Sequence, residues 1–429
     1  MKHCFSILLA LFILQVKAQI PEMVVAPNIA TVQLFQNGNQ LAYPLIRLNA
    51  LEQMELHFDD LDPSVKSYYY TYQLCNADWT PAMLSQFDFI KGYSQTRLTT
   101  YRVSSVAFTK YVHYQAVLPD RNSIPSRSGN YILKVFKDGD TSKLLFTKRF
   151  LVVDDKASIS AAIVQPFNSQ IIRTHHKVQF RVNFSEQLNL MNYLQQTKVM
   201  ILQNDRWDNA ITHVRPTFFN RNIMDFDCEA DAVFPAGKEW RWLDLRSFRL
   251  QSDRVLNAIY TKTSTEIFVK PDADRSNLRV NFFRDANGAY YIQNTEGLNP
   301  YWQGDYATVH FAFAPAGGQP IRGKDVYIVG RFTNYEYNSK TKLVFNAEKG
   351  LYETSLFLKQ GYYDYAYVTI DQGTQPGPKQ LPDFQQTEGN YWESEDEYTI
   401  LVYYKALGGR HDELVGVSKV NSMTNKTLR

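Results

Sequence analysis

Few residues of this sequence have the types and spacing that catalysis or metal binding requires. The stretch Ser339 to Lys342 fits the Ser-x-x-Lys spelling of some acyl-transfer enzymes, but the companion motifs are missing and a hairpin turn is expected there. Asp272 and Asp274 begin like a calcium loop, yet Asn277 stands where that loop needs glycine and Phe283 where it needs glutamate. We therefore predict no catalytic residue, no cofactor and no metal site.

Two further patterns invite a chemical interpretation. His175 and His176 are adjacent, and neighbouring side chains on a strand point to opposite faces, so a shared metal ion is not expected and both are predicted at the surface. Glycoside cleavage needs two carboxylates at a separation that only folding sets. Because nothing in the sequence selects such a pair, an enzyme is not predicted.

A tyrosine-rich strand ends in a cluster that could serve the fold or a partner. Residues 68–75 read as a strand on which alternate side chains share a face. Cys75 ends it, Asp78 can accept hydrogen bonds in the following turn, and Trp79 can bury a large apolar area. We expect these three residues to stabilise the first module, with a contact surface for a partner as the alternative.

A second cluster, Arg206, Trp207 and Asp208, offers the same two interpretations. Exposed tryptophan and arginine are typical anchors of protein interfaces, whereas buried ones stabilise a fold. Both clusters are therefore candidate partner-binding or structural motifs.

The stretch after residue 325 suggests a sugar-binding module. A glycine, an aromatic residue and an asparagine follow one strand as in glycogen- or starch-binding sandwiches, although Tyr335 replaces the usual tryptophan. If this module binds glycan, an exposed aromatic platform is expected around Tyr335, Tyr337 and Trp392.

Short alternating strands separated by turn signals predict an all-β protein. Asp138-Gly139 supplies the positive φ angles of a tight turn, so residues 131–137 and 143–153 should pair as antiparallel strands. Residues 174–184 alternate apolar and polar side chains, which marks another half-buried strand. The expected architecture is a set of tandem β-sandwich modules, immunoglobulin-like or fibronectin-like at the N-terminus and like a carbohydrate-binding module at the C-terminus.

The length of the chain and its boundary signals predict several domains. A charged start, the apolar run Phe5 to Val16 and a small residue before Gln19 predict a secretory signal that is too short to span a membrane. The expected divisions are a signal peptide at 1–18, an N-terminal β-sandwich at 19–155, a central β-rich domain at 156–316, a C-terminal β-sandwich at 317–405 and a C-terminal extension at 406–429.

Charge and cysteine content argue against a nucleic-acid partner and against a disulfide bond. The formal charge of +3 falls to +1 when Lys2 and Lys17 leave with the signal, so no nucleic-acid partner is expected. Cys75 and Cys228 then remain as the two thiols. Because they are expected in different domains, and buried free thiols are common, a bond between them is not favoured.

Several long strings resemble one protein family along nearly the whole mature chain. They are YQLCNADWTPAML with FIKGYSQT, YVHYQAVLPD with SGNYILKVF, LQNDRWDNAI, FPAGKEW, KQGYYDYAYV and HDELVGVS. In these strings the chain is similar to exported Bacteroidetes proteins described as the plug protein of the type IX secretion system.

The resemblance implies a non-enzymatic periplasmic protein associated with the outer-membrane translocon. Its partner would be a very large β-barrel, whose periplasmic mouth the plug closes by protein contact when no cargo passes. Barrels of about 36 strands enclose a lumen that would leak solutes unless something filled or capped it. A monomer is expected, and membrane contact is expected only through the translocon.

Two alternatives of another class stay open. One is a periplasmic or surface protein that binds glycan through the C-terminal sandwich. The other is a polysaccharide-active enzyme, which would need two carboxylates in a cleft.

Overall fold

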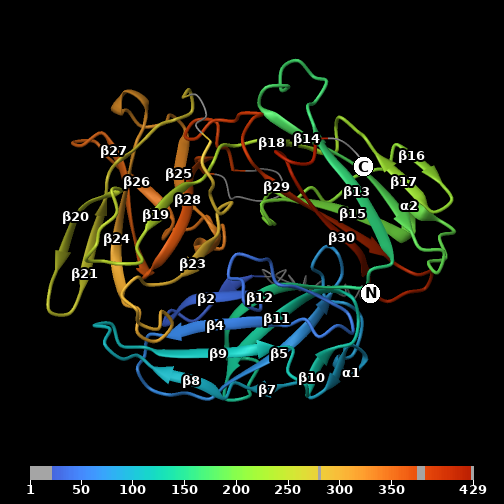
Figure 1. The fold of residues 1–429 in the computed structure, drawn as a ribbon, viewed down its shortest axis with the longest axis horizontal. Helices are drawn as coiled ribbons and strands as arrows, with labels where there is room; N and C mark the ends of the chain where they lie inside the picture. The colour runs from blue at the N-terminus through green and yellow to red at the C-terminus, as the bar shows by residue number, and fades with distance from the viewer. Residues whose placement is uncertain (1–21, 279–281, 374–381, 427–429) are drawn as a thin grey trace, which may run out of the picture.

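The computed structural model describes residues 22–278, 282–373 and 382–426, and it is built almost entirely from β-strands. The all-β prediction is confirmed. Figure 1 shows three β modules, with the blue N-terminal one below and the other two side by side above it. The expected signal peptide, residues 1–18, lies outside the described residues. Within them, no helix is long and apolar enough to cross a membrane.

The first module is a sandwich of two sheets, in the orders β2-β4-β9-β8 and β1-β12-β11-β5-β7, whose neighbouring strands are antiparallel; β3 is added beside β12 in parallel. Its elements are β1 (Met23–Val24), β2 (Ile29–Gln36), β3 (Leu45–Arg47), β4 (Met54–Asp60), β5 (Tyr68–Cys75), α1 (Gln86–Phe89), β6 (Ile90–Gly92), β7 (Thr96–Arg97), β8 (Thr100–Val103), β9 (Val112–Leu118), β10 (Ser123–Pro125), β11 (Gly129–Lys137) and β12 (Leu144–Val153).

Alternation along these strands builds the core of the first module. Tyr68, Tyr70 and Tyr72 share the buried face of β5, each at most 2% exposed. Strands β11 and β12 pair as predicted, and Asp138 takes the positive φ of 58° that their turn needs. The predicted hairpin is therefore confirmed.

The second module is assembled from two distant parts of the chain. Strand β15 pairs with β29, which pairs with β30, while β13, β14, β16, β17 and β18 form the facing sheet. Its elements are β13 (Ala157–Val164), β14 (His175–Phe184), α2 (Tyr193–Gln196), β15 (Thr197–Gln203), β16 (Phe218–Asn220), β17 (Ile223–Phe226), β18 (Val233–Pro235), β29 (Glu397–Tyr404) and β30 (Glu413–Asn421). One apolar core joins both sheets.

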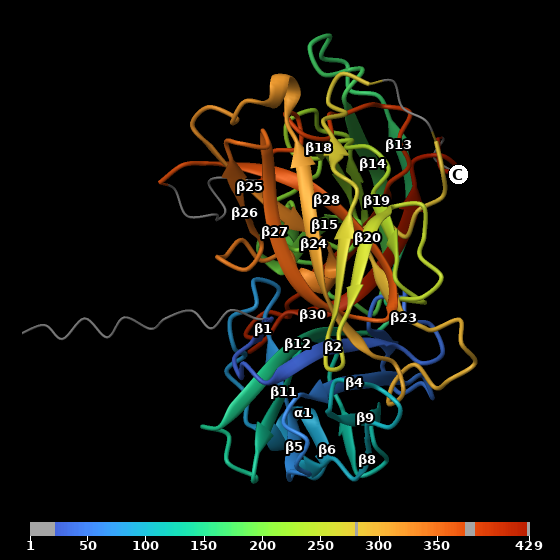
Figure 2. The same cartoon turned by 90° about the vertical axis from the view of Figure 1, so that its left-hand side faces the viewer.

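The third module lies between those two parts in sequence, and a ten-stranded sheet connects its strands (Figures 1 and 2). Its elements are β19 (Arg241–Asp244), β20 (Val255–Tyr260), β21 (Thr265–Val269), β22 (Asp272–Ala273), β23 (Tyr290–Ile292), β24 (Tyr306–Ala314), η1 (Ala316–Gly318), β25 (Lys324–Val329), η2 (Arg331–Thr333), β26 (Lys342–Asn346), β27 (Leu351–Lys359) and β28 (Gly361–Asp371).

The sheets do not follow the domain divisions expected from the sequence. Strands β24 and β27 pair across the expected division at 316/317, and β29 and β30 pair across the one at 405/406. The Pro- and Gly-rich stretch at 315–320 is a connection within one sheet. The expected C-terminal extension contains β30, a strand of the second module.

Removing residues 406–429 should therefore unfold the second module. The truncation deletes β30 with the buried side chains of Leu414, Val415 and Val420, each of which contributes roughly 1.5–3 kcal/mol. We expect loss of the cooperative thermal transition of this module and rapid proteolysis of residues 157–235. A chain ending at Lys426 keeps β30 and is the matched control. Equal protease resistance of the two chains would contradict this topology.

Candidate functional site

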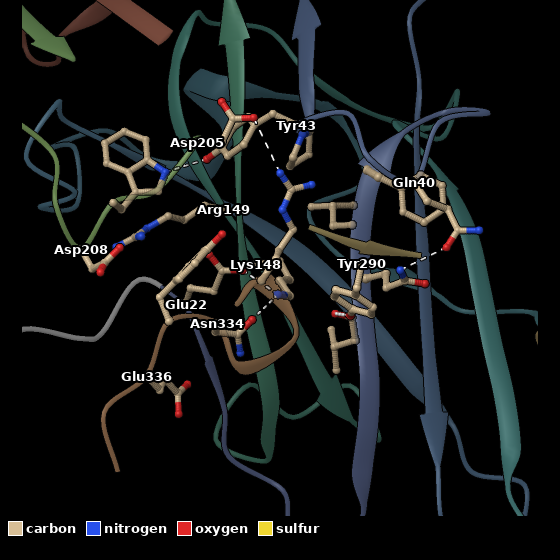
Figure 3. A pocket seen from close by; sticks show the side chains of 18 residues that line it. Glu22, Gln40, Tyr43, Lys148, Arg149, Asp205, Asp208, Tyr290, Asn334 and Glu336 are labelled. Carbon is tan, nitrogen blue, oxygen red and sulfur yellow. Dashed lines mark hydrogen bonds and ion pairs between the residues drawn. The ribbon is translucent and has the colours of Figure 1, made fainter. Parts of the chain in front are cut away.

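The three modules meet around a cavity of about 240 Å³ (Figure 3). Lys148 of β12 spans it: its Nζ lies 2.6 Å from a Glu22 carboxylate oxygen and 2.7 Å from Oδ1 of Asn334, which follows η2 of the third module. The polar side chains at the cavity come from all three modules: Glu22, Gln33, Gln40, Tyr43, Lys148, Arg149, Asp205, Asp208, Tyr290, Arg331, Asn334, Tyr335 and Glu336. We call this region the three-module junction.

Both tryptophan clusters singled out from the sequence contact each other in this junction. The Trp79 and Trp207 rings meet edge to face at 4.8 Å, and the Arg149 guanidinium lies 4.9 Å from one ring centroid and 5.2 Å from the other. Nε1 of Trp207 donates a hydrogen bond of 2.8 Å to the Tyr43 hydroxyl. Burial lowers the pKa of Arg149. The stack joins the first module to the second through aromatic and cation–π contacts.

Arg206 is buried in the same region at 3% exposure. Its Nε and Nη2 donate to the two carboxylate oxygens of Asp208 at 3.0 and 2.6 Å, and the Tyr337 hydroxyl donates to Asp208 at 2.6 Å. Burial opposes the charge of Arg206, but Asp208 outweighs it and raises the pKa of that guanidinium. The guanidinium also lies over three aromatic rings of the third module: Trp240, Tyr335 and Phe384.

These contacts correct the expected aromatic platform for glycan. Tyr335 and Tyr337 are half-buried against Arg206 and Asp208 rather than presented together at the surface. Trp392 belongs to another place, where its ring meets His176 edge to face at 4.8 Å. The three residues were grouped by type, and folding separates one of them because its segment joins the second module.

The remaining residues of the first cluster have local tasks. Oδ1 of Asp78 accepts hydrogen bonds from the Thr80 amide and hydroxyl at 3.0 and 2.6 Å, which fixes the turn that contains Trp79. Cys75 is buried, and burial raises its pKa to about 12, which disfavours the reactive thiolate form. Cys75 and Cys228 are free thiols.

The histidine pair shows one clear error of the sequence interpretation. His176 is fully buried rather than exposed: it is hydrogen-bonded to the Tyr398 hydroxyl at 2.9 Å and to the Trp392 carbonyl at 2.8 Å. The alternating pattern placed one histidine inward, and its partners come from late in the chain: Tyr398 lies on β29 and Trp392 in the turn region before it. Among the described residues, no group of His, Cys, Asp or Glu is arranged to hold a metal ion.

A buried ion pair joins the first and third modules. Nζ of Lys359 lies 2.5 Å from Oδ2 of Asp59, and both side chains are 1% exposed. The Tyr306 hydroxyl donates to the same oxygen at 2.6 Å, and Nδ1 of His113 lies 2.7 Å from Oδ1 of Asp59. Burial lowers the pKa of His113 to about 4, despite the neighbouring carboxylate. These groups fix one module against the other.

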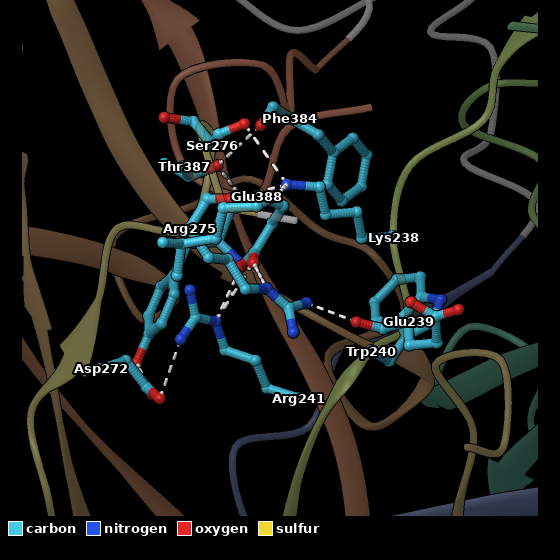
Figure 4. A network of polar contacts seen from close by, with 12 residues as sticks. Lys238, Glu239, Trp240, Arg241, Asp272, Arg275, Ser276, Phe384, Thr387 and Glu388 are labelled. Atoms are coloured by element: carbon cyan, nitrogen blue, oxygen red, sulfur yellow. Dashed lines mark hydrogen bonds and ion pairs between the residues drawn. The ribbon is translucent and has the colours of Figure 1, made fainter. Parts of the chain in front are cut away.

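Inside the third module, Asp272 belongs to a network of arginines (Figure 4). Arg241 donates 3.0 Å hydrogen bonds to both Asp272 and Glu388, and Arg275 also pairs with Glu388. Burial opposes ionisation of Glu388, but the two arginines outweigh it and lower its pKa to about 2. Asp272, the apparent start of a calcium loop, is thus part of a buried ion-pair network inside the third module.

Two carboxyl groups of the third module accept hydrogen bonds from backbone amides rather than facing an open cleft together. Asp364 is fully buried and its Oδ2 accepts the Ala286 amide at 2.5 Å, while the half-buried Asp285 accepts the amides of Trp240 and Asn287. Burial raises the pKa of Asp364 to about 8, with a further contribution from Asp285. Together they order the turn at 285–288.

Sequence reasoning missed several residues of the junctions, including Arg149, Asp59 and Lys359. Arg149 and Asp59 lie on ordinary strands with no motif around them, so no local signal marks them, whereas Lys359 opens the string KQGYYDYAYV. Asp412 had a signal, because it belongs to the string HDELVGVS. Its Oδ2 accepts the Ala77 amide at 3.0 Å and contacts Nζ of Lys198 at 2.8 Å, which ties the first cluster to the second module.

Replacing Asp208 should weaken the junction strongly. Asp208→Asn leaves the buried Arg206 without its carboxylate, and we expect the free energy of unfolding to fall by about 3–5 kcal/mol in urea denaturation. Asp225→Asn removes the carboxylate of the Arg181–Asp225 pair, in which Arg181 is exposed and Asp225 half-buried, and should change stability much less. Similar losses in both variants would contradict a stabilising role for the buried pair.

Asp364 should make stability depend on pH. Its pKa of about 8 in the folded chain exceeds the ordinary value of 3.8, so the folded state holds an extra proton between these values. This contribution to stability is present at low pH and is lost as pH rises from about 4 to 8. Asp364→Asn cannot ionise, so its melting temperature relative to that of the wild type should increase between pH 5 and pH 9. A difference independent of pH would contradict the shifted pKa.

Comparison with known proteins gives the first module a family. No protein with a curated description matches the chain. The fold is similar to a crystal structure of a hypothetical protein from Parabacteroides merdae ATCC 43184, with a TM-score of 0.87 and 29% sequence identity over 93% of this chain and 98% of that one. Residues 29–154 match the family model described as the Type 9 secretion system plug protein 1st domain. The first module of this chain therefore matches the first domain of the plug protein family that the sequence resembles.

Proposed function

We propose that this protein is a non-enzymatic plug, which closes the periplasmic mouth of the outer-membrane type IX translocon when no cargo passes. The observation that carries the proposal is the family match over residues 29–154, which spans nearly the whole first module. The proposed location is the periplasm, after removal of residues 1–18, and the proposed partner is the large β-barrel of the translocon.

The arrangement of the modules suits such a task. A plug must keep its shape while it covers a wide lumen, and it must bind through a broad surface that can be released. The stack of Trp79, Arg149 and Trp207 and the buried Asp59–Lys359 pair hold the modules against each other. A body of this kind presents a fixed outer surface instead of a string of independent domains.

The residue environments favour contact over catalysis. The Cys75 thiol is buried with a raised pKa, and the raised pKa of Asp364 accompanies hydrogen bonds that order a turn. Strongly perturbed groups are candidates for catalysis, but ion-pair and hydrogen-bond networks perturb pKa values too. The half-buried positions of Tyr335 and Tyr337 likewise give the glycan-binding alternative no exposed platform.

The proposal predicts that the tagged protein, purified with gently solubilised outer membranes, carries a very large β-barrel protein with it. Mass spectrometry identifies the partner, and an untagged strain is the control. Deleting the gene should increase leakage of small solutes through the outer membrane, and the wild-type gene should restore the barrier. Recovery of no barrel, together with retention of the protein on a polysaccharide column, would overturn the proposal in favour of glycan binding.

A further inference from the structure

One end of the first module concentrates exposed apolar side chains. Met83, Phe87 and Tyr93 are 84%, 85% and 68% exposed, although the neighbouring Phe89 is buried at 1%. They lie on the segment that contains α1 and β6, in the lower module of Figure 1. Burying a side chain of this size is worth roughly 1.5–3 kcal/mol, and these three forgo that stabilisation in the isolated protein.

The same end is positively charged. Strand β6 pairs with β10, so residues 81–97 and 120–127 lie side by side, and Arg410 approaches Asp88 at 3.8 Å from the second module. We call these segments together with Arg410 the α1 surface. Its charged residues are Lys91, Arg97, Arg121, Arg127 and Arg410, against Asp88 and Asp120. The resulting excess of three positive charges equals the net charge of the whole 429-residue chain.

Arg410 pairs with Asp88, but other positive charges of the α1 surface have no carboxylate partner within the described residues. In the described parts of the chain, neither Lys91 nor Arg121 forms an ion pair with a carboxylate, and Arg127 uses its Nε on the Asp88 carbonyl at 3.1 Å. The two acids serve local structure: Asp88 accepts the Ser85 amide at 3.0 Å, and Asp120 accepts the Asn122 amide at 2.9 Å. Cations without internal partners are available to an outside one.

We propose that the α1 surface is the part of the plug that docks on the translocon, against an acidic rim of protein around its periplasmic opening. This inference rests on the proposed function. Tyrosine, phenylalanine, methionine and arginine are the residues enriched in protein interfaces, and a ring of cations steers and orients an acidic partner. Arginine matches the planar, bidentate geometry of carboxylates, and arginine supplies four of the five cations here.

Variants of exposed residues test the surface without disturbing the core. Phe87→Ser with Tyr93→Ser removes the apolar contacts, and Lys91→Glu with Arg121→Glu reverses two unpaired charges. The matched controls lie on the hairpin of β20 and β21: Leu256→Ser with Ile259→Ser, and Lys262→Glu with Lys270→Glu, all at exposed positions. Each variant must keep the wild-type circular dichroism and melting temperature.

The readout is the amount of barrel protein that copurifies with each variant from outer membranes at low and high salt. We expect about a tenfold loss of copurified barrel protein for both α1-surface variants and no loss for the controls. The loss caused by the charge reversal should be larger at low salt than at high salt, because salt screens charge interactions. If both α1-surface variants recover as much barrel protein as the wild type does, this inference is wrong, while the proposed function still stands. If the wild type recovers no barrel, the proposed function itself fails.

A lipid partner is the competing outcome. Wild-type protein is floated with vesicles of phosphatidylglycerol and phosphatidylethanolamine, alongside the same variants. Vesicle binding that both α1-surface variants abolish, with barrel recovery unchanged, would assign the surface to the membrane and overturn the docking proposal. Absence of vesicle binding, with barrel recovery lost in those variants, supports it.

Discussion

The structure depends on how three β modules bury charge where they meet. Arg206 lies among aromatic rings of the third module, and its guanidinium forms an ion pair with Asp208. Separation of the second and third modules would therefore remove the guanidinium from these rings and expose the ion pair. Asp59 and Lys359 impose the same condition on the first and third modules. A buried pair that loses one partner is costly, so each such contact favours one relative position of the modules over others.

Chain topology strengthens that constraint. The second module is completed by β29 and β30, which follow the whole third module in the sequence. The loop between these two strands places Asp412 against Ala77 of the first module. Tyr403 of β29 also donates to Asn130 of β11 at 2.8 Å within the buried contact. The third module is therefore inserted in the sequence between the two parts of the second module.

Local patterns predicted local structure well. Alternating tyrosines placed Tyr68, Tyr70 and Tyr72 on one face, and Asp138-Gly139 marked a turn that forms. Pairing between β15 and β29 could not be predicted in the same way, because nearly 200 residues separate the two strands and their alternation fits many partners. Trp79 and Trp207 were predicted as partner-binding or structural residues, but their contact with each other depends on the same long-range topology. Arg149, between their rings, had no sequence signal at all.

The plug proposal describes a protein that acts through its shape and outer surface. The most direct measurement is electron cryomicroscopy of translocons isolated from cells with their periplasmic partners and without cargo. The plug proposal predicts density for all three modules across the periplasmic opening, in the relative arrangement of Figure 1, with the α1 surface against the barrel. An opening that is empty or closed by another protein would contradict it.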